Sequence, residues 1–228
     1  MELNRLVKWL HEQANPDFRV GMARFGIPEG RTLGVRIPVL RAEAKRIGRN
    51  HELALALYRE NIHEAKILAS MIAEPERFAP EQMDEWVADF DSWDICDQCC
   101  INLFRYRPYA YDKVREYMAA ERLFTRRAGF ALLATLAVGD KHSPDDRFTA
   151  FFPAIEHYAL SDDRDAIKKA VNWALRQIGK RNATLYPEAL RLAERLAASE
   201  NRTARWIGRD AVREFGLERV RRRTGVEK

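Results

Sequence analysis

Helical periodicity without strand signals is the feature that most constrains the fold of this chain. Apolar residues recur at spacings of three and four in block after block, and Pro, Gly and Asn interrupt them at short intervals. Alternating β-branched runs are few, and no Asn-Gly or Asp-Gly hairpin turns join them. The pattern therefore predicts an all-α protein.

The blocks give approximate helix positions. Pro38, Pro80 and Pro108 fall in or near first turns, where proline is tolerated. The expected helices cover about residues 2–14, 16–25, 36–48, 50–59, 63–73, 80–89, 92–105, 108–119, 124–138, 145–159, 163–179, 184–198 and 201–215.

Several blocks resemble one another, which indicates internal repeats. Each opens with basic residues and continues with small apolar ones: 125–134, 166–175, 202–212 and, more weakly, 63–69. From Ala128 to Ala170 the offset is 42 residues, within the span of two-helix HEAT-type repeats. Such repeats stack into a solenoid, so we expect one domain over residues 1–228 with a concave basic face.

Charge is distributed unevenly along the chain. The net charge is +5, and residues 201–228 alone carry nine Lys or Arg against four Asp or Glu. Residues 74–97 instead carry nine acidic residues and one arginine. A basic C-terminal half is typical of phosphate contact, although a solvated helix face explains the charge equally well. The sequence leaves open whether the basic tail, residues 217–228, is ordered.

The cysteines are grouped at Cys96, Cys99 and Cys100. No second pair or histidine cluster completes a zinc site, and no βαβ pattern indicates a redox motif. We therefore interpret them as small buried hydrophobic residues. P-loop, GxGxxG and HExxH motifs are also absent from the sequence, so no metal or nucleotide cofactor is expected.

The composition favours a soluble protein. Apolar residues make up 46% of the chain and charged residues 32%, enough for a core and a solvated surface. The first residues read as an amphipathic helix rather than a signal peptide, and no run is long enough to span a membrane. We expect a cytoplasmic protein, with a monomer as the default state.

Two helical segments combine tryptophan with charge. Trp93 and Asp97 lie four residues apart and share one helix face, and Trp173 and Arg176 share another. Tryptophan is costly to expose and a carboxylate is costly to bury, so a face offering both usually lines a cleft. Two such faces could enclose a cationic group.

The chain resembles the AlkD-type DNA alkylation repair glycosylases, which are all-helical HEAT-like repeat proteins. The resemblance covers nearly the whole chain. It rests on Met22-Ala-Arg-Phe25, Gly34-Val-Arg-Ile-Pro-Val-Leu-Arg41, Trp93-Asp-Ile-Cys-Asp97, Arg126-Arg127-Ala128 and Lys168-Lys-Ala-Val-Asn-Trp-Ala-Leu-Arg176. It implies hydrolysis of the N-glycosidic bond of N3- or N7-alkylated purines in double-stranded DNA, without a closed base-flipping pocket. The sequence has no well-placed catalytic lysine motif, so we do not expect strand cleavage.

The resemblance also implies roles for individual residues. Asp97 matches the catalytic carboxylate, Trp93 and Trp173 match the aromatic walls, and Arg127 and Arg176 match basic residues near the DNA backbone. Arg126 could exchange roles with Arg127. Phe25 stands where the family often has tyrosine, so any hydrogen bond made by that hydroxyl is in doubt here.

Two rival functions stay open at this point. One is a non-catalytic HEAT-like module that binds distorted or branched DNA, since a repeat scaffold can lose activity and keep a basic surface. The other is a protein-binding solenoid, which would need fewer arginines on the second helices of the repeats.

Overall fold

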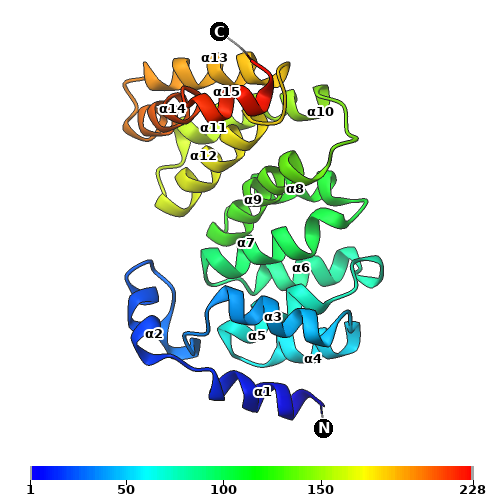
Figure 1. Cartoon of the computed structure of the whole chain (residues 1–228). Helices are drawn as coiled ribbons and strands as arrows, with labels where there is room; N and C mark the ends of the chain where they lie inside the picture. The colour runs from blue at the N-terminus through cyan, green and yellow to red at the C-terminus, as the bar shows by residue number, and fades with distance from the viewer. Residues whose placement is uncertain (1, 227–228) are drawn as a thin grey trace. The chain divides into compact units, whose positions relative to one another are not determined.

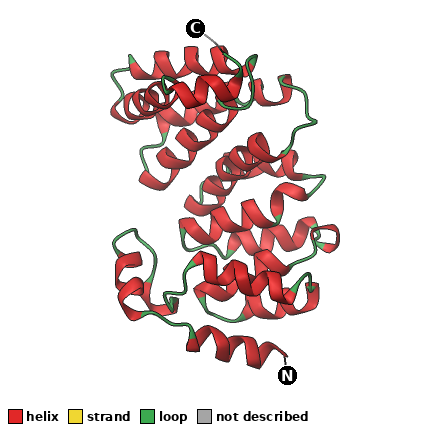
Figure 2. Cartoon of the chain, viewed as in Figure 1, coloured by secondary structure: helices red, strands yellow, loops and turns green. Residues whose placement is uncertain are grey.

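The chain is built from helices joined by short loops in a computed structural model that describes residues 2–226 (Figures 1 and 2). No β-strand occurs within these residues, so the predicted all-α class is confirmed. The α-helices are α1 (Glu2–Glu12), α2 (Pro16–Ala23), α3 (Ile37–Ile47), α4 (His51–Arg59), α5 (His63–Ile72), α6 (Pro80–Ala88), α7 (Trp93–Asn102), α8 (Ala110–Ala119), α9 (Leu123–Gly139), α10 (Asp146–Thr149), α11 (Phe152–Ser161), α12 (Asp165–Gly179), α13 (Leu185–Ala197), α14 (Arg202–Phe215) and α15 (Glu218–Thr224). Short 3-10 helices are η1 (Glu29–Arg31), η2 (Pro75–Arg77) and η3 (Phe104–Tyr106).

Helix positions follow the sequence prediction closely, with one block that is wrong. The predicted helix over residues 145–159 is two helices, α10 and α11. Pro153 lies in the first turn of α11, and its ring would clash with the carbonyl of Thr149, where α10 ends. The sequence prediction also missed α15 and extended the helix over 92–105 past its observed end at Asn102.

Local side chains explain where several helices begin. Asn50 accepts a hydrogen bond from the backbone N–H of Leu53 at 3.1 Å, and Asn201 accepts one from Ala204 at 3.0 Å. Each bond satisfies an N–H group that has no partner inside its helix. Proline occupies the first turn of α3 and α6, where its missing N–H costs nothing.

Contacts divide the chain into two compact units, Met1–Ala110 and Tyr111–Lys228. In the first unit α5 packs against α3, α4 and α7, and it is buried from His63 to Ser70. Within α5 the carboxylate of Glu64 accepts hydrogen bonds from the backbone N–H groups of Leu33, Gly34 and Val35 at 2.7–3.2 Å. This carboxylate fastens the loop before α3 to the centre of the unit.

In the second unit the most extensive packing joins α9 to α12 and α13 to α14. The helix α9 is buried from Arg127 to Ala137, which explains its long run of small apolar residues. At Gly208 of α14 an added Cβ would lie 2.1 Å from the backbone nitrogen of Ala197. The absence of a side chain at Gly208 therefore sets how closely α13 and α14 approach.

The expected tail contains a helix. Val220 and Thr224 of α15 are buried, and residues 227–228 of the predicted tail lie outside the described residues. That residues 1–228 form a single domain stays a prediction. None of the helices in residues 2–226 has the length and apolar character needed to cross a membrane.

Candidate functional site

Trp93 is the first residue of α7 and presents much of its ring to solvent. Its side chain is held in place, because the indole Nε1–H donates to the backbone carbonyl of Phe25 at 2.9 Å. The residue is 36% exposed, whereas Trp86 in the same unit is 4% exposed. An accessible ring with its only polar group satisfied suits contact with a ligand through the ring face.

Phe25 lies in the turn that follows α2 and is 73% exposed. The next residue, Gly26, has a φ of +77°, a left-handed conformation that glycine adopts without strain. The hydrogen bond from Trp93 therefore holds the backbone of this turn while the phenyl ring of Phe25 stays in solvent. The structure brings these two predicted residues together.

Asp97 lies one turn after Trp93 on α7 and is partly exposed. Residues at this spacing share a helix face, as the sequence predicted. Asp94, on a different side of α7, is buried, and its Oδ2 lies 2.7 Å from Nε2 of His63 in α5. The two carboxylates of this helix turn are therefore in different environments.

The His63–Asp94 pair is a contact that the sequence did not reveal, since its members lie 31 residues apart. Burial by itself lowers the pKa of His63, but the hydrogen bond to Asp94 and its charge outweigh burial and raise that pKa. The pair joins α5 to α7 at the start of the helix that carries Trp93 and Asp97. It positions α7 without entering the exposed face.

The three cysteines of α7 are buried and form no disulfide, which confirms their interpretation as packing residues. Burial raises the pKa of the Cys99 thiol well above its usual value. Among residues 2–226, no cluster of three or more His, Cys, Asp or Glu residues is placed to hold a metal ion.

In the second unit, Trp173 lies on α12 and is partly exposed. With the amide of Gln177 oriented to satisfy its neighbours, the amide oxygen accepts from the Trp173 indole nitrogen at 3.1 Å. This ring also has a satisfied polar group and an accessible surface.

Arg126 and Arg127 lie where the buried part of α9 begins. Arg126 pairs with Asp162 at 2.5 Å, and its guanidinium lies over the Tyr158 ring at 4.7 Å. Arg127 is 5% exposed and donates to the carbonyl of Ala166 at 2.6 Å. Both side chains therefore hold neighbouring helices.

Asp162 is the centre of a buried ion-pair cluster. Burial by itself raises the pKa of Asp162, but hydrogen bonds from Arg164 and Arg126 outweigh it and lower the pKa to about 2. The carboxylate stays ionised at neutral pH and fastens the end of α11 to the start of α9.

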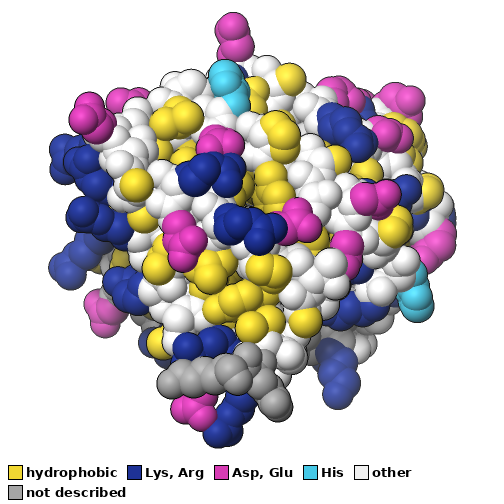
Figure 3. Space-filling view, turned by 90° about the horizontal axis from the view of Figure 1, so that it is seen from above, with side chains coloured by type: hydrophobic (Ala, Val, Ile, Leu, Met, Phe, Trp, Pro, Cys, Tyr) yellow, Lys and Arg dark blue, Asp and Glu magenta, His cyan; other side chains and the backbone are white. Residues whose placement is uncertain are grey.

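Arg176 of α12 also forms ion pairs within the protein. Its guanidinium pairs with Glu214 of α14 and lies 3.6 Å from Asp210. Basic and acidic side chains are similarly interspersed on the face of the molecule in Figure 3. The carboxylates beside Arg176 reduce the positive potential that it presents to a phosphate.

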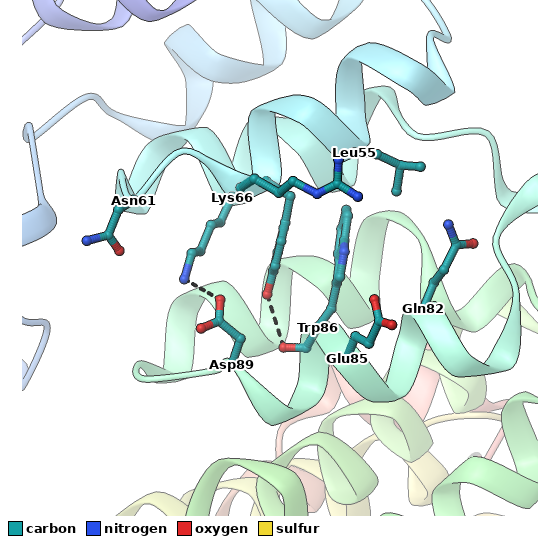
Figure 4. Close-up of a pocket in the computed structure, with 9 residues that line it drawn as sticks. Leu55, Asn61, Lys66, Gln82, Glu85, Trp86 and Asp89 are labelled. Carbon is teal, nitrogen blue, oxygen red and sulfur yellow. Dashed lines mark hydrogen bonds and ion pairs between the residues drawn. The ribbon is translucent and has the colours of Figure 1, made fainter.

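The cavity in Figure 4 is separate from the predicted site. It has a volume of about 370 Å³, and none of the predicted site residues lines it. Tyr58 and Trp86 are stacked in its wall with centroids 3.7 Å apart, and Lys66 pairs with Asp89 at 2.5 Å. Its walls carry both signs of charge, with Lys66 already paired.

The comparisons with known proteins assign the family. A family model described as DNA alkylation repair enzyme matches residues 6–215. The chain belongs to this family.

A solved structure supports the fold. It is described as a new family of proteins related to the HEAT-like repeat DNA glycosylases with affinity for branched DNA structures. The two chains are 18% identical with a TM-score of 0.80, and the match covers 94% of this chain and 95% of the other. The HEAT-like repeat fold is therefore confirmed. A second match, to an engineered protein, has a TM-score of 0.40 and 13% identity, over 73% of this chain and 47% of that one. No curated protein matches the chain.

Proposed function

We propose that this DNA repair protein is a monofunctional glycosylase that releases cationic N3- or N7-alkylated purines from duplex DNA. The observation that carries the proposal is the exposed face of α7, where Trp93 is anchored to Phe25 and Asp97 follows one turn later. Membership of the DNA alkylation repair family supports this reaction class.

The chemistry needs little more than an aromatic surface and a carboxylate. An alkylated purine already carries positive charge, so it leaves with the electron pair of the glycosidic bond and becomes neutral. The deoxyribose then develops cationic character at C1′, which a nearby carboxylate stabilises. Water adds at C1′ and loses a proton, which leaves an abasic site and the free base.

In this proposal Asp97 stabilises the sugar cation and orients the attacking water. The ring face of Trp93 attracts the same cation, with a contribution of about 0.5–2 kcal/mol. Trp173 is the second aromatic wall. Phe25 adds an exposed ring without the hydroxyl of tyrosine, so it contributes surface contact and no hydrogen bond.

The exposure of these rings favours recognition on an open surface. Phe25 is 73% exposed and Trp93 is 36% exposed, values that do not fit the walls of a closed base pocket. We infer that the lesion is recognised through the DNA backbone and deoxyribose, which avoids the cost of about a few kcal/mol for extruding a base.

The predicted arginines have distinct proposed roles. Arg176 is the candidate for phosphate contact, because its side chain is partly exposed beside its ion pairs. Arg127 and Arg126 support that surface by holding α9 to its neighbours. The basic concave face, a monomeric state and a cytoplasmic location remain predictions that accompany this proposal.

The decisive assay measures the free base. Purified protein is incubated with duplex DNA containing N7-methylguanine, without added metal, and the released base is quantified by mass spectrometry. We expect release by the wild type and a loss of about 100-fold or more in Asp97→Asn, in line with removal of a transition-state charge partner. Glu81→Gln, which changes an exposed carboxylate of α6, is the matched control and should retain wild-type activity.

Absence of release by the wild type would contradict the proposed activity. Undiminished release by Asp97→Asn would instead remove Asp97 from the mechanism. Binding of both proteins to the same duplex, measured by fluorescence anisotropy, separates loss of chemistry from loss of affinity.

One alternative has an observation in its favour. The related solved structure is described by affinity for branched DNA, and its fold matches over nearly the whole chain. A non-catalytic module predicts tighter binding to a four-way junction than to a duplex of equal length, together with no base release. A glycosylase predicts release and no such preference.

A further inference from the structure

A basic cavity lies in the first unit, at the ends of α3, α5 and α7. Its volume is about 380 Å³, and no Asp or Glu lines it. The cations in its wall are Arg41 and Lys45 of α3, Arg49 in the loop after α3, and Arg105 of η3.

No carboxylate within residues 2–226 pairs with these four cations, unlike Arg126 and Arg176, which form ion pairs. The arginines donate only to neutral oxygens. These are the Gln98 side chain at 3.3 Å from Arg41, the Met71 and Ala73 carbonyls at 3.1 and 2.6 Å from Arg49, and the Tyr106 hydroxyl at 2.5 Å from Arg105. Lys45 is exposed. Like charges gathered without counterions repel one another.

The helix ends around the cavity do not balance this charge. The C-terminal turns of α3, α5 and α7 contribute to its wall, and each carries a dipole equivalent to about −0.5 charge. Three such ends sum to about −1.5, against four positive side chains. If the charge of Arg49 is counted as fully neutralised at the C-terminal end of α5, three cations still face the two other helix ends. A net positive charge is therefore available to an external anion.

The cavity is continuous with the helix that carries the candidate site. Trp93, Asp97 and Ile101 follow at four-residue intervals on α7, and Ile101 lines the cavity. With a rise of about 1.5 Å per residue, Ile101 lies about 6 Å beyond Asp97 and about 12 Å beyond Trp93 along the helix. A DNA strand advances about 3.4 Å per nucleotide along the duplex axis, so for α7 lying parallel to that axis these separations correspond to about two to four nucleotides.

We propose that this cavity binds a backbone phosphate of the DNA strand, two to four nucleotides away from the deoxyribose at Trp93 and Asp97. The site rests on the proposed function because it takes DNA as its ligand. It holds the strand in register with α7, through Arg41, Lys45 and Arg105, and does not take part in bond cleavage.

The test compares two variants that lose the same charge. Arg41→Gln with Lys45→Gln removes two cations from the cavity. Arg59→Gln with Lys141→Gln removes two exposed cations elsewhere, so both proteins change from a net charge of +5 to +3. Binding to an undamaged, fluorescein-labelled duplex is measured by anisotropy over about 50–200 mM salt.

For the cavity variant, we expect the slope of log Kd against log salt to be smaller by about 0.9 for each phosphate that the cavity no longer binds. The control should keep the wild-type slope. Base release at saturating protein should be unchanged in the control. If the double variant folds poorly, Lys45→Glu provides the same test, because it leaves the Arg41–Gln98 hydrogen bond intact. Its affinity for duplex DNA should also be lower than that of the wild type.

Equal slopes for the cavity variant, the control and the wild type would overturn the inference while leaving base release, and so the proposed function, intact. Failure of the wild type to bind duplex at all would overturn both. A free-anion site is the other outcome: inorganic phosphate would raise the melting temperature of the wild type but not of the cavity variant, with DNA binding unchanged. That result would also overturn a DNA-backbone site.

Discussion

At the scale of single residues, the indole of Trp93 combines a ligand-facing ring with a structural hydrogen bond. Its Nε1–H fixes the carbonyl of Phe25, which lies 68 residues earlier in the chain. The turn after α2 therefore depends on a side chain that the proposed chemistry also uses.

Replacement of Trp93 separates these two roles. Trp93→Phe keeps an aromatic face but loses the donor, at a cost of about 1 kcal/mol in unfolding free energy. Trp93→Ala loses both, and we expect single-turnover base release to fall further in Trp93→Ala than in Trp93→Phe. Equal rates for the two variants, measured at saturating protein, would show that the ring face does not contribute.

The pH dependence of stability should reveal the Asp162 cluster. The folded-state pKa of about 2 lies below the usual value of 3.8, so ionised Asp162 stabilises the fold above about pH 4. This contribution, on the order of 2 kcal/mol, is lost as the pH falls from about 4 through 2.

Urea unfolding of wild type and Asp162→Asn over this pH range provides the measurement. The difference in unfolding free energy should be largest at neutral pH and should shrink on acidification. Asp163→Asn, which changes the exposed neighbouring carboxylate, should behave as the wild type at every pH. A constant difference for Asp162→Asn would contradict the assignment.

At the scale of helices and loops, interior contacts decide how neighbouring elements meet. Glu64 binds three successive backbone N–H groups and so sets the path into α3. Gly34 in the same loop has a φ of +84°, and an added Cβ would lie 2.2 Å from the carbonyl oxygen of Asn15. Glu64 and Gly34 therefore fix the path of the loop before α3, one by hydrogen bonds from α5 and the other by its lack of a side chain.

Gly208 permits the closest approach between α13 and α14. Gly208→Ala should destabilise the protein by at least about 2 kcal/mol, because the new methyl group meets backbone atoms that cannot move aside easily. At Gly216, after the same helix, an added Cβ has its nearest contacts at 3.5 Å. Gly216→Ala should therefore change the melting temperature little, and equal losses for the two variants would contradict this account.

At the scale of the whole molecule, the charge of +5 is modest for a DNA-binding protein. Affinity must then come from local groups of cations, and binding should weaken steeply with salt. We expect a slope of at least about 3 in log Kd against log salt for a duplex, which corresponds to three or more phosphate contacts. A flat salt dependence in anisotropy titrations would favour a protein partner over DNA.

Much of the architecture could be predicted because it depends on local spacing. Apolar periodicity and the Pro, Gly and Asn residues between blocks predicted the helices to within three residues in every block except 145–159. That block was wrong because its apolar pattern continues across Pro153, whose ring would clash with the Thr149 carbonyl in a continuous helix. Trp93 and Asp97 share a helix face for the same local reason.

The environment of each charged side chain depended on the tertiary structure. From the sequence alone, Asp97 was distinguished from Asp94 by its spacing from Trp93 and by its match to a family, and Arg126, Arg127 and Arg176 were all candidate phosphate ligands. Folding buried Asp94 against His63 and placed carboxylates beside Arg126 and Arg176. Those partners lie 31 to 38 residues away in the chain, and their approach depends on how whole helices pack. Sequence by itself determined the helices and the family of this protein, because both depend on local residue patterns. Only the tertiary structure decided which charges pair internally and which, as in the cavity of Arg41 and Lys45, have no counterion.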